Sequence, residues 1–218
     1  GLDSSTVSAI AASKHSNLKA FSVSIQEKSF DESSKARTVA SQLGLQHKIS
    51  SFEPKDFLQA QEEIFAHMDE PLADSSLLPT WMLMRQVRQE GLSCVLSGDG
   101  ADEILGGYPT LQAHRIAPIV QPFRRPLQQL FSKLPTSFEG LSVDYMVRRF
   151  AENLSHPWWK RHQRWMGAWL PEEISAKEEV WEIAEFWARK AGQGSLGQVL
   201  WLDQRMYLSE CVLVKVDR

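Results

Sequence analysis

Hydrophobic positions in the first hundred residues alternate between a period of two and a helical period. Phe21 to Ile25 and Leu45 to Ile49 read as short β-strands. Asp31 to Leu43, Lys55 to Met68 and Ser75 to Glu90 carry apolar residues at three- and four-residue steps, which predicts amphipathic helices. Strands that alternate with helices predict an α/β fold with a doubly wound, mostly parallel sheet.

A third strand is expected over the apolar run Leu92 to Leu96, and a turn rich in glycine and carboxylates follows it directly. This turn runs from Ser97 through Asp99 and Asp102 to Glu103. Glycines at the carboxyl end of a strand let the backbone approach a ligand, and carboxylates can hold a divalent cation that bridges to phosphate. From the residues alone, an acidic surface loop that caps the next helix is an equal alternative.

The chain begins with a second candidate site, at the start of a predicted helix over Val7 to Ala12. Asp3, Ser4 and Ser5 suit a helix amino terminus, where free N–H groups and the helix dipole attract anions. An ordinary capped helix has the same features. Ligands of parallel sheets bind at the carboxyl ends of the strands, so we expect this helix start and the Ser97 turn to face one ligand.

Beyond Pro109 the strand pattern stops and helical spacing continues. Helices are predicted over Leu111 to Val120, Val143 to Leu154, Glu178 to Lys190 and Leu196 to Leu208. We therefore divide the chain into an α/β core, residues 1–110, and a helical part of the same domain, residues 111–218.

Composition narrows the class of protein. The 218 residues are 43% hydrophobic with a net charge of −3, which suits a core-forming chain and argues against long-range attraction to nucleic acid or an acidic membrane. No apolar run is long enough to span a membrane. Cys94 and Cys211 form no CxxC motif, so a reduced, cytoplasmic setting is expected, with Cys94 a buried core residue.

Trp158 to Trp165 interleaves aromatic and basic side chains. Such a segment can stack on bases and hold phosphates, but the acidic net charge favours tryptophans in a helical core beneath a solvated basic face. The six histidines form no zinc-like pattern, and neither GxGxxG nor a Walker A lysine motif is present.

Five segments, in order, resemble the asparagine synthetases of the N-type ATP pyrophosphatase (PP-loop) fold. Gly1-Leu2-Asp3-Ser4-Ser5 is similar to the end of the S-G-G-x-D-S pyrophosphate loop. The stretch from Ser97 to Tyr108 is similar to the signature L-S-G-D-G-x-D-E-x-x-G-G-Y. The other similar segments are Lys28 to Glu32, Asp69 to Ser76 and Leu213 to Arg218. The resemblance covers nearly the whole chain.

This resemblance implies a ligase that uses ATP and Mg²⁺. ATP and the side-chain carboxylate of aspartate would form an aspartyl adenylate and pyrophosphate, and ammonia would then displace AMP to give asparagine. The resemblance places pyrophosphate on Gly1, Leu2, Asp3, Ser4 and Ser5, magnesium on Asp3 and Asp102, adenine on Val23, adenosine and the α-phosphate on Ser97 and Gly98, and the acceptor amino acid or ammonia beside Asp99. Its implied catalytic residues are Asp3, Asp99 and Asp102.

The chain also departs from the family pattern. The Ser-Gly that precedes Gly1 in the family is absent together with its strand, which lies inside the sheet of related folds; we therefore expect the first strand to be missing and apolar surface to be exposed. The glutaminase domain and the segment after Val216-Asp217-Arg218 are absent as well. We expect a piece of a longer protein with a glutaminase domain upstream, weakly active or inactive alone. Related enzymes that close a β-lactam or cyclise a peptide, and a non-catalytic nucleotide-binding fragment, are the alternatives.

Overall fold

The computed structural model describes residues 1–26, 31–70, 72, 74–131, 143–167, 180–192 and 196–217. They form two compact units, one of Gly1–Gly100 with Cys211–Arg218 and one of Ala101–Glu210. Six residues of the family-like segments lie outside the described residues, namely Lys28, Ser29, Phe30, Pro71, Ala73 and Arg218, as do Glu178 and Glu179 at the start of a predicted helix. The division of the domain at residue 110 stays a prediction.

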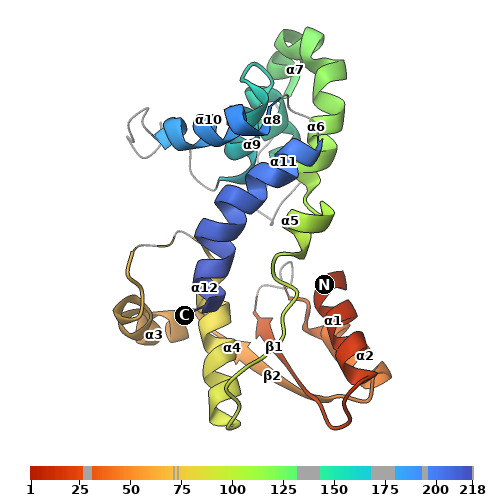
Figure 1. The fold of residues 1–218 in the computed structure, drawn as a ribbon, viewed down its shortest axis with the longest axis vertical. Coiled ribbons are helices and arrows are strands. Elements are labelled where there is room, and N and C mark those ends of the chain that lie inside the picture. Colours follow the sequence, from red (N-terminus) through yellow and green to blue (C-terminus); the bar gives the residue numbers. More distant parts are fainter. Residues whose placement is uncertain are drawn as a thin grey trace. The chain divides into compact units, whose positions relative to one another are not determined.

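The first unit contains a parallel pair of strands, β1 (Lys19–Ile25) and β2 (Gln46–Phe52), joined through helix α2 (Ser33–Gln42) (Figure 1). Lys19 lies opposite Gln46 and Ile25 opposite Phe52. Helices α2 and α4 (Leu77–Gln89) pack against both strands. Two of the three predicted strands are confirmed, and so is an α/β fold, although the described sheet has two strands.

The remaining helices of this unit are α1 (Leu2–Ala12), α3 (Pro54–Ala66) and the short α12 (Leu213–Asp217). Helix α3 begins with a reciprocal capping box between Glu53 and Asp56, which satisfies backbone donors at its start. Helix α1 has no buried residue. An apolar-rich helix that buries none of its side chains leaves this part of the unit open.

The predicted strand over Leu92 to Leu96 is wrong. These residues form no strand, Leu96 is 76% exposed, and Cys94 is exposed rather than in the core. In the described chain β1 pairs only with β2, so no neighbouring strand supplies backbone partners to this stretch. An apolar run predicts a need for burial, but a strand exists only where another strand pairs with it.

The second unit is helical, as predicted. Its described elements are α5 (Ala101–Leu105), α6 (Pro109–Val120), a 3₁₀ turn (Gln121–Phe123), α7 (Arg124–Phe131), α8 (Val143–Asn153), α9 (Trp158–Met166), α10 (Val180–Ala191), α11 (Leu196–Asp203) and a π-helical segment (Gln204–Val212) that runs on into the first unit's chain. Helices α5, α7 and α9 were not predicted. None of the helices described here is long and apolar enough to cross a membrane.

Helix α9 corrects the expectation for the Trp158 to Trp165 segment. The residues that it buries are Arg161 and His162, whereas its tryptophans are only partly buried. Trp165 stacks on Phe150 of α8 and meets His114 of α6 edge-on. The basic side chains are therefore not simply a solvated face, because helix packing turns two of them inward.

Candidate functional site

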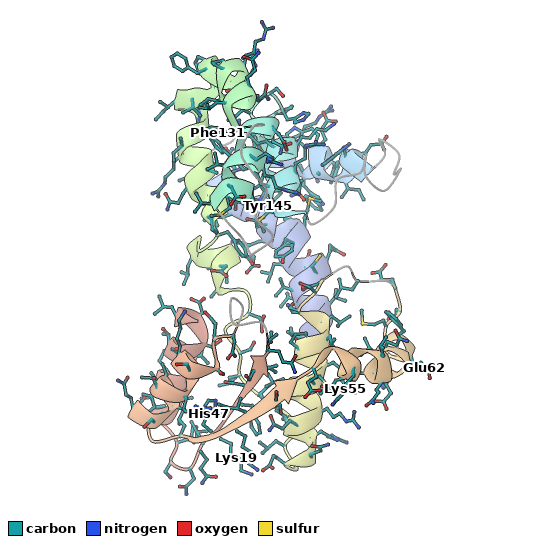
Figure 2. The ribbon with its side chains drawn as sticks, turned by 180° about the vertical axis from the view of Figure 1, so that it is seen from behind. Lys19, His47, Lys55, Glu62, Phe131 and Tyr145 are labelled. Carbon is teal, nitrogen blue, oxygen red and sulfur yellow. The ribbon has the colours of Figure 1, made fainter. Side chains whose placement is uncertain are left out.

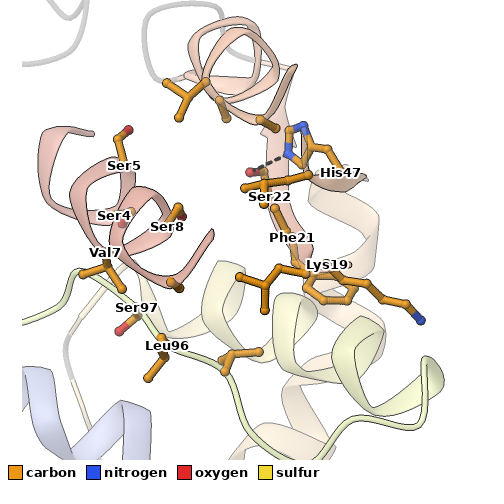
Figure 3. A pocket seen from close by; sticks show the side chains of 18 of the residues that line it. Ser4, Ser5, Val7, Ser8, Lys19, Phe21, Ser22, His47, Leu96 and Ser97 are labelled. Carbon is orange, nitrogen blue, oxygen red and sulfur yellow. Dashed lines mark hydrogen bonds between the residues drawn. The ribbon is translucent and has the colours of Figure 1, made fainter. Parts of the chain in front are cut away.

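A cavity of about 1050 Å³ lies in the first unit, with walls from α1, β1, α2 and residues 92–97 (Figure 3). Ligand pockets commonly enclose roughly 300–1,000 Å³. Six residues that the resemblance assigns to nucleotide binding line this cavity: Gly1, Leu2, Ser4, Ser5, Val23 and Ser97. The two stretches expected to face one ligand thus border the same space.

Gly98 brings the Ser97 turn directly against the first turn of α1. A Cβ atom at Gly98 would lie 2.5 Å from the backbone nitrogen of Ser4 and 2.9 Å from Cβ of Asp3. Any side chain at this position would push the two segments apart. The close approach therefore requires glycine for lack of space.

The start of α1 leaves its backbone donors open. Gly1 is the N-cap residue, and no side chain caps the helix. The Ser5 hydroxyl donates back to the Gly1 carbonyl, 2.8 Å away, so it does not cap the N–H groups either. Asp3 adds a carboxylate in this first turn. Free N–H groups at the positive end of a helix dipole favour an anion beside them.

The structure places the remaining predicted residues in two different units. Asp99 is exposed in the first unit, and its N–H lies 3.4 Å from the Ser97 hydroxyl. Asp102 belongs to α5 of the second unit. A Cβ at Gly107 would come within 1.8 Å of Asp102 Oδ1, so the carboxylate occupies the space that this glycine leaves. The joint use of Asp3 and Asp102 stays a prediction.

The two residues that the resemblance assigns to magnesium, Asp3 and Asp102, are both carboxylates. The described residues contain no group of three or more histidine, cysteine, aspartate or glutamate side chains that could hold a metal ion. Mg²⁺ commonly takes one or two carboxylates and fills its other positions with phosphate oxygens and water. Asp3, beside the open N–H groups of α1, and Asp102 are carboxylates of this kind.

Sequence reasoning missed a polar pair in the cavity wall. His47 of β2 and Ser22 of β1 both line the cavity, and His47 Nε2 lies 3.0 Å from the Ser22 hydroxyl (Figure 3). Burial and then the charge of Arg37 hold the pKa of His47 below its ordinary value, which favours the neutral imidazole. The alternation of residues along each strand indicates which side chains share a face of the sheet. Only the pairing register of the two strands shows that His47 and Ser22 lie next to each other.

Comparison with known proteins identifies the family. The model of the family described as asparagine synthase matches residues 1–218. A Mycobacterium bovis protein, provisionally named asparagine synthetase (glutamine-hydrolysing), is 27% identical over 226 residues that cover all of this chain. Asparagine synthetase (glutamine-hydrolysing) 1 of Bacillus subtilis is 32% identical over 57% of this chain and 19% of its own length. This chain spans 34% of the length of the M. bovis relative. The match over every residue shows that the chain belongs to the asparagine synthase family.

Proposed function

We propose that this chain is the ATP-dependent, amide-forming part of a glutamine-hydrolysing asparagine synthetase. ATP and the side-chain carboxylate of aspartate give an aspartyl adenylate and pyrophosphate, and ammonia then forms asparagine and releases AMP. The observation that carries this proposal is the convergence of the α1 start and the Ser97 turn on one cavity, through a contact that requires Gly98. The family match over the whole chain supports it.

The start of α1 would bind the pyrophosphate. Adenylation places negative charge on the leaving pyrophosphate, and preorganised N–H donors stabilise such charge in the transition state. Gly1, Leu2, Ser4 and Ser5 would contribute backbone and hydroxyl groups from the cavity wall. Asp3 and Asp102 would hold Mg²⁺, which supplies further neutralisation of the phosphate charge when it is bound.

The other part of the cavity would bind the nucleoside. Val23 offers an apolar wall for adenine from β1, and Ser97 lies beside the α1 start where the α-phosphate would follow. Gly98 lets the backbone approach the phosphates without a side chain. Exposed Asp99 would contact the aspartate substrate or the incoming ammonia next to the reacting carboxylate.

Ammonia would come from a glutaminase domain of the longer protein. The relatives are named as glutamine-hydrolysing enzymes, and this chain spans only part of their length. We also propose that the 218-residue chain alone is weakly active or inactive. Asparagine formation from ammonia by this chain at the rate of the full-length protein would contradict that statement.

Product analysis tests the reaction. Full-length protein with ATP, aspartate, ammonium and Mg²⁺ should form AMP, pyrophosphate and asparagine in equal amounts. ADP and phosphate would exclude an adenylating ligase, and release of AMP and pyrophosphate only with a carboxylate substrate other than aspartate would point to the β-lactam-forming or peptide-cyclising alternative. No pyrophosphate release with any acceptor would favour a non-catalytic nucleotide-binding protein.

A glycine substitution tests the site. Gly98→Ala should lower kcat/KM for pyrophosphate release by roughly 100-fold, the size of effect that a misplacement of about 1 Å produces. Gly44→Asn is a matched control, because a Cβ at Gly44 meets no atom within 4 Å and asparagine tolerates its positive φ of 66°. Equal activity of the two variants would show that the contact between Gly98 and the first turn of α1 is not needed for the reaction.

A further inference from the structure

The second half of the signature contains helix α5 and, directly after it, a turn whose backbone hydrogen-bonds to the start of that helix. After α5, the N–H groups of Gly106 and Gly107 both point to the Asp102 carbonyl, at 2.8 and 3.3 Å. Gly106 has φ of +80°, which places it in the left-handed region that favours glycine. This turn sets Gly107 against the Asp102 carboxylate.

Tyr108 closes the same turn with a side-chain hydrogen bond. Its hydroxyl donates to Oε1 of Glu103 over 2.6 Å, and Glu103 is only 1% exposed. Burial, and then the neighbouring Glu103 carboxylate, raise the pKa of the Tyr108 phenol above its ordinary value, so it stays a donor at neutral pH. A buried carboxylate needs such a donor, and a bond to a charged acceptor is stronger than one between neutral groups.

The π-helical segment ties α5 from a second side. The Gln204 side-chain amide donates to the Glu103 carbonyl over 3.2 Å. The Tyr207 ring packs edge-on against Tyr108, with ring centroids 6.0 Å apart. Next to Gln204, Asp203 is fully buried and accepts a 2.6 Å hydrogen bond from His162, which anchors the end of α11 in the core of the unit. π-Helical segments often mark functional positions.

The short helix needs these ties. Helix α5 has five residues, and isolated helices of this length are not stable in water. We propose that Glu103, Tyr108 and Gln204 are positioning residues that hold α5 so that the Asp102 carboxylate keeps one orientation for a metal ion. This inference rests on the proposed function, in which Asp102 binds Mg²⁺.

The test compares hydroxyl removal at two tyrosines in the full-length protein. For Tyr108→Phe, the Mg²⁺ concentration that half-saturates pyrophosphate release should rise about 10-fold, the expected effect of one lost hydrogen bond to a charged group. The kcat at saturating Mg²⁺ should change much less. Affinity for the Mn²⁺ complex of ATP, measured by electron paramagnetic resonance, should fall by the same factor. Tyr145→Phe is the matched control, because its hydroxyl accepts from Arg149 within α8, and it should change neither quantity.

Three further variants separate the side chains' roles. Glu103→Gln keeps an acceptor oxygen for the Tyr108 hydroxyl and should retain most of the Mn²⁺ affinity that Glu103→Ala loses. Gln204→Ala should weaken Mn²⁺ binding by about threefold, because it removes a neutral hydrogen bond. If Tyr108→Phe does not fold, these variants decide the question by the same measurements.

The outcomes also distinguish this inference from the proposed function. An unchanged Mg²⁺ dependence in Asp102→Asn would overturn the metal role on which both rest. If Asp102→Asn loses metal affinity but Tyr108→Phe keeps it, or if Tyr108→Phe lowers only kcat, the positioning role is wrong and the proposed function stands.

Discussion

The two units of this protein differ in what surrounds most of their charged side chains. In the first unit, Lys215 pairs with Asp74, and Glu90 pairs with both Lys19 and Lys48, so charges join segments that are far apart in the sequence. The second unit encloses polar side chains among aromatic rings, and among the described residues it has more buried side-chain atoms without a hydrogen-bond partner than the first unit, where His47 Nδ1 and Gln86 Oε1 are such atoms. Whether a buried charge stabilises a fold depends on the groups that surround it. We therefore expect the stability of the two units to respond differently to the loss of a charged partner and to a fall in pH.

The Lys215 pair shows the first arrangement. Lys215 is 7% exposed and Asp74 is 12% exposed as side chains, and Nζ of Lys215 donates to Asp74 Oδ2 over 3.1 Å and to the Ser76 hydroxyl over 2.5 Å. Burial alone would raise the pKa of Asp74, but hydrogen bonds from Ser76 and Lys215 outweigh it and hold that pKa below its ordinary value. This pair ties the last segment of the chain to the residues before α4.

The histidine cluster shows the second arrangement. The His114 ring lies 5.2 Å from His162 and 4.9 Å from Trp165, centroid to centroid, and the Arg161 guanidinium lies 5.3 Å from the Trp165 ring centroid. Among the described residues, Nε2 of His114, Nε of Arg161, Nδ1 of His162 and Oδ2 of Asp203 are buried without a hydrogen-bond partner. Aromatic packing thus dominates here, and polar groups are less completely satisfied.

Removing one partner of the Lys215 pair should have the largest effect. Lys215→Met should lower the free energy of unfolding by about 3–5 kcal/mol, because it leaves the Asp74 carboxylate buried without its cation. Denaturant unfolding followed by circular dichroism measures this. Lys35→Met, at a lysine that is 80% exposed, is the control and should change stability little. A loss of unfolding free energy below about 1 kcal/mol for Lys215→Met would show that this pair contributes no more than a surface ion pair. If the double variant Lys215→Met/Asp74→Leu is more stable than Lys215→Met, the unpaired buried carboxylate is the cause of the loss.

A fall in pH should destabilise the second unit through His114. Burial, and then the charges of His162 and Arg161, lower the pKa of His114 to about 3. The unfolded chain binds a proton at His114 near pH 6.5 and the folded chain only near pH 3, so the stability from neutral His114 is complete above pH 6.5 and falls as the pH drops toward 3.

The difference between the parent chain and His114→Phe isolates this contribution. Between pH 7 and 3 the parent should lose roughly 3–5 kcal/mol more than the variant, as its pKa shift implies. Urea unfolding at several pH values measures this difference. His15→Gln changes an exposed histidine and should leave the parent's pH profile unaltered. Parallel profiles for parent and His114→Phe would show that His114 does not carry the acid sensitivity.

Glu90 should give the smallest effect. Hydrogen bonds from Lys48 and then Lys19 lower its pKa to about 2. The sign is that of a depressed acid: stability from the ionised carboxylate is present above the ordinary pKa near 4.5 and is lost as the pH falls through about 2. Glu90→Gln should lower the melting temperature slightly at neutral pH, less so in high salt, and less at pH 2 than at pH 7. Glu62→Gln on α3 is an exposed control (Figure 2). An equal Glu90→Gln effect at pH 2 and pH 7 would rule out the ion pairs as its cause.

The sequence predicted a helix or strand well where its periodic apolar residues pack against another element in the structure. Strands β1 and β2 and helices α2, α3 and α4 lie within a few residues of their predicted bounds. Helix α9 shows the limit, since its aromatic and basic residues predict amphipathic character but not that Arg161 and His162 are the side chains turned inward. Orientation of a helix depends on the helices that pack around it, which a single segment does not encode.

By itself, the sequence determined the α/β start, the helical continuation and the residues of the family signature, because periodicity, turn residues and motif spacing are local properties. Only the tertiary structure decided which of these residues meet. It left Leu92 to Leu96 without a pairing strand, brought Gly98 against Ser4, and placed Lys215 on Asp74. These outcomes depend on contacts between residues far apart in the chain, and such contacts form only where the packing of whole elements brings their atoms within reach.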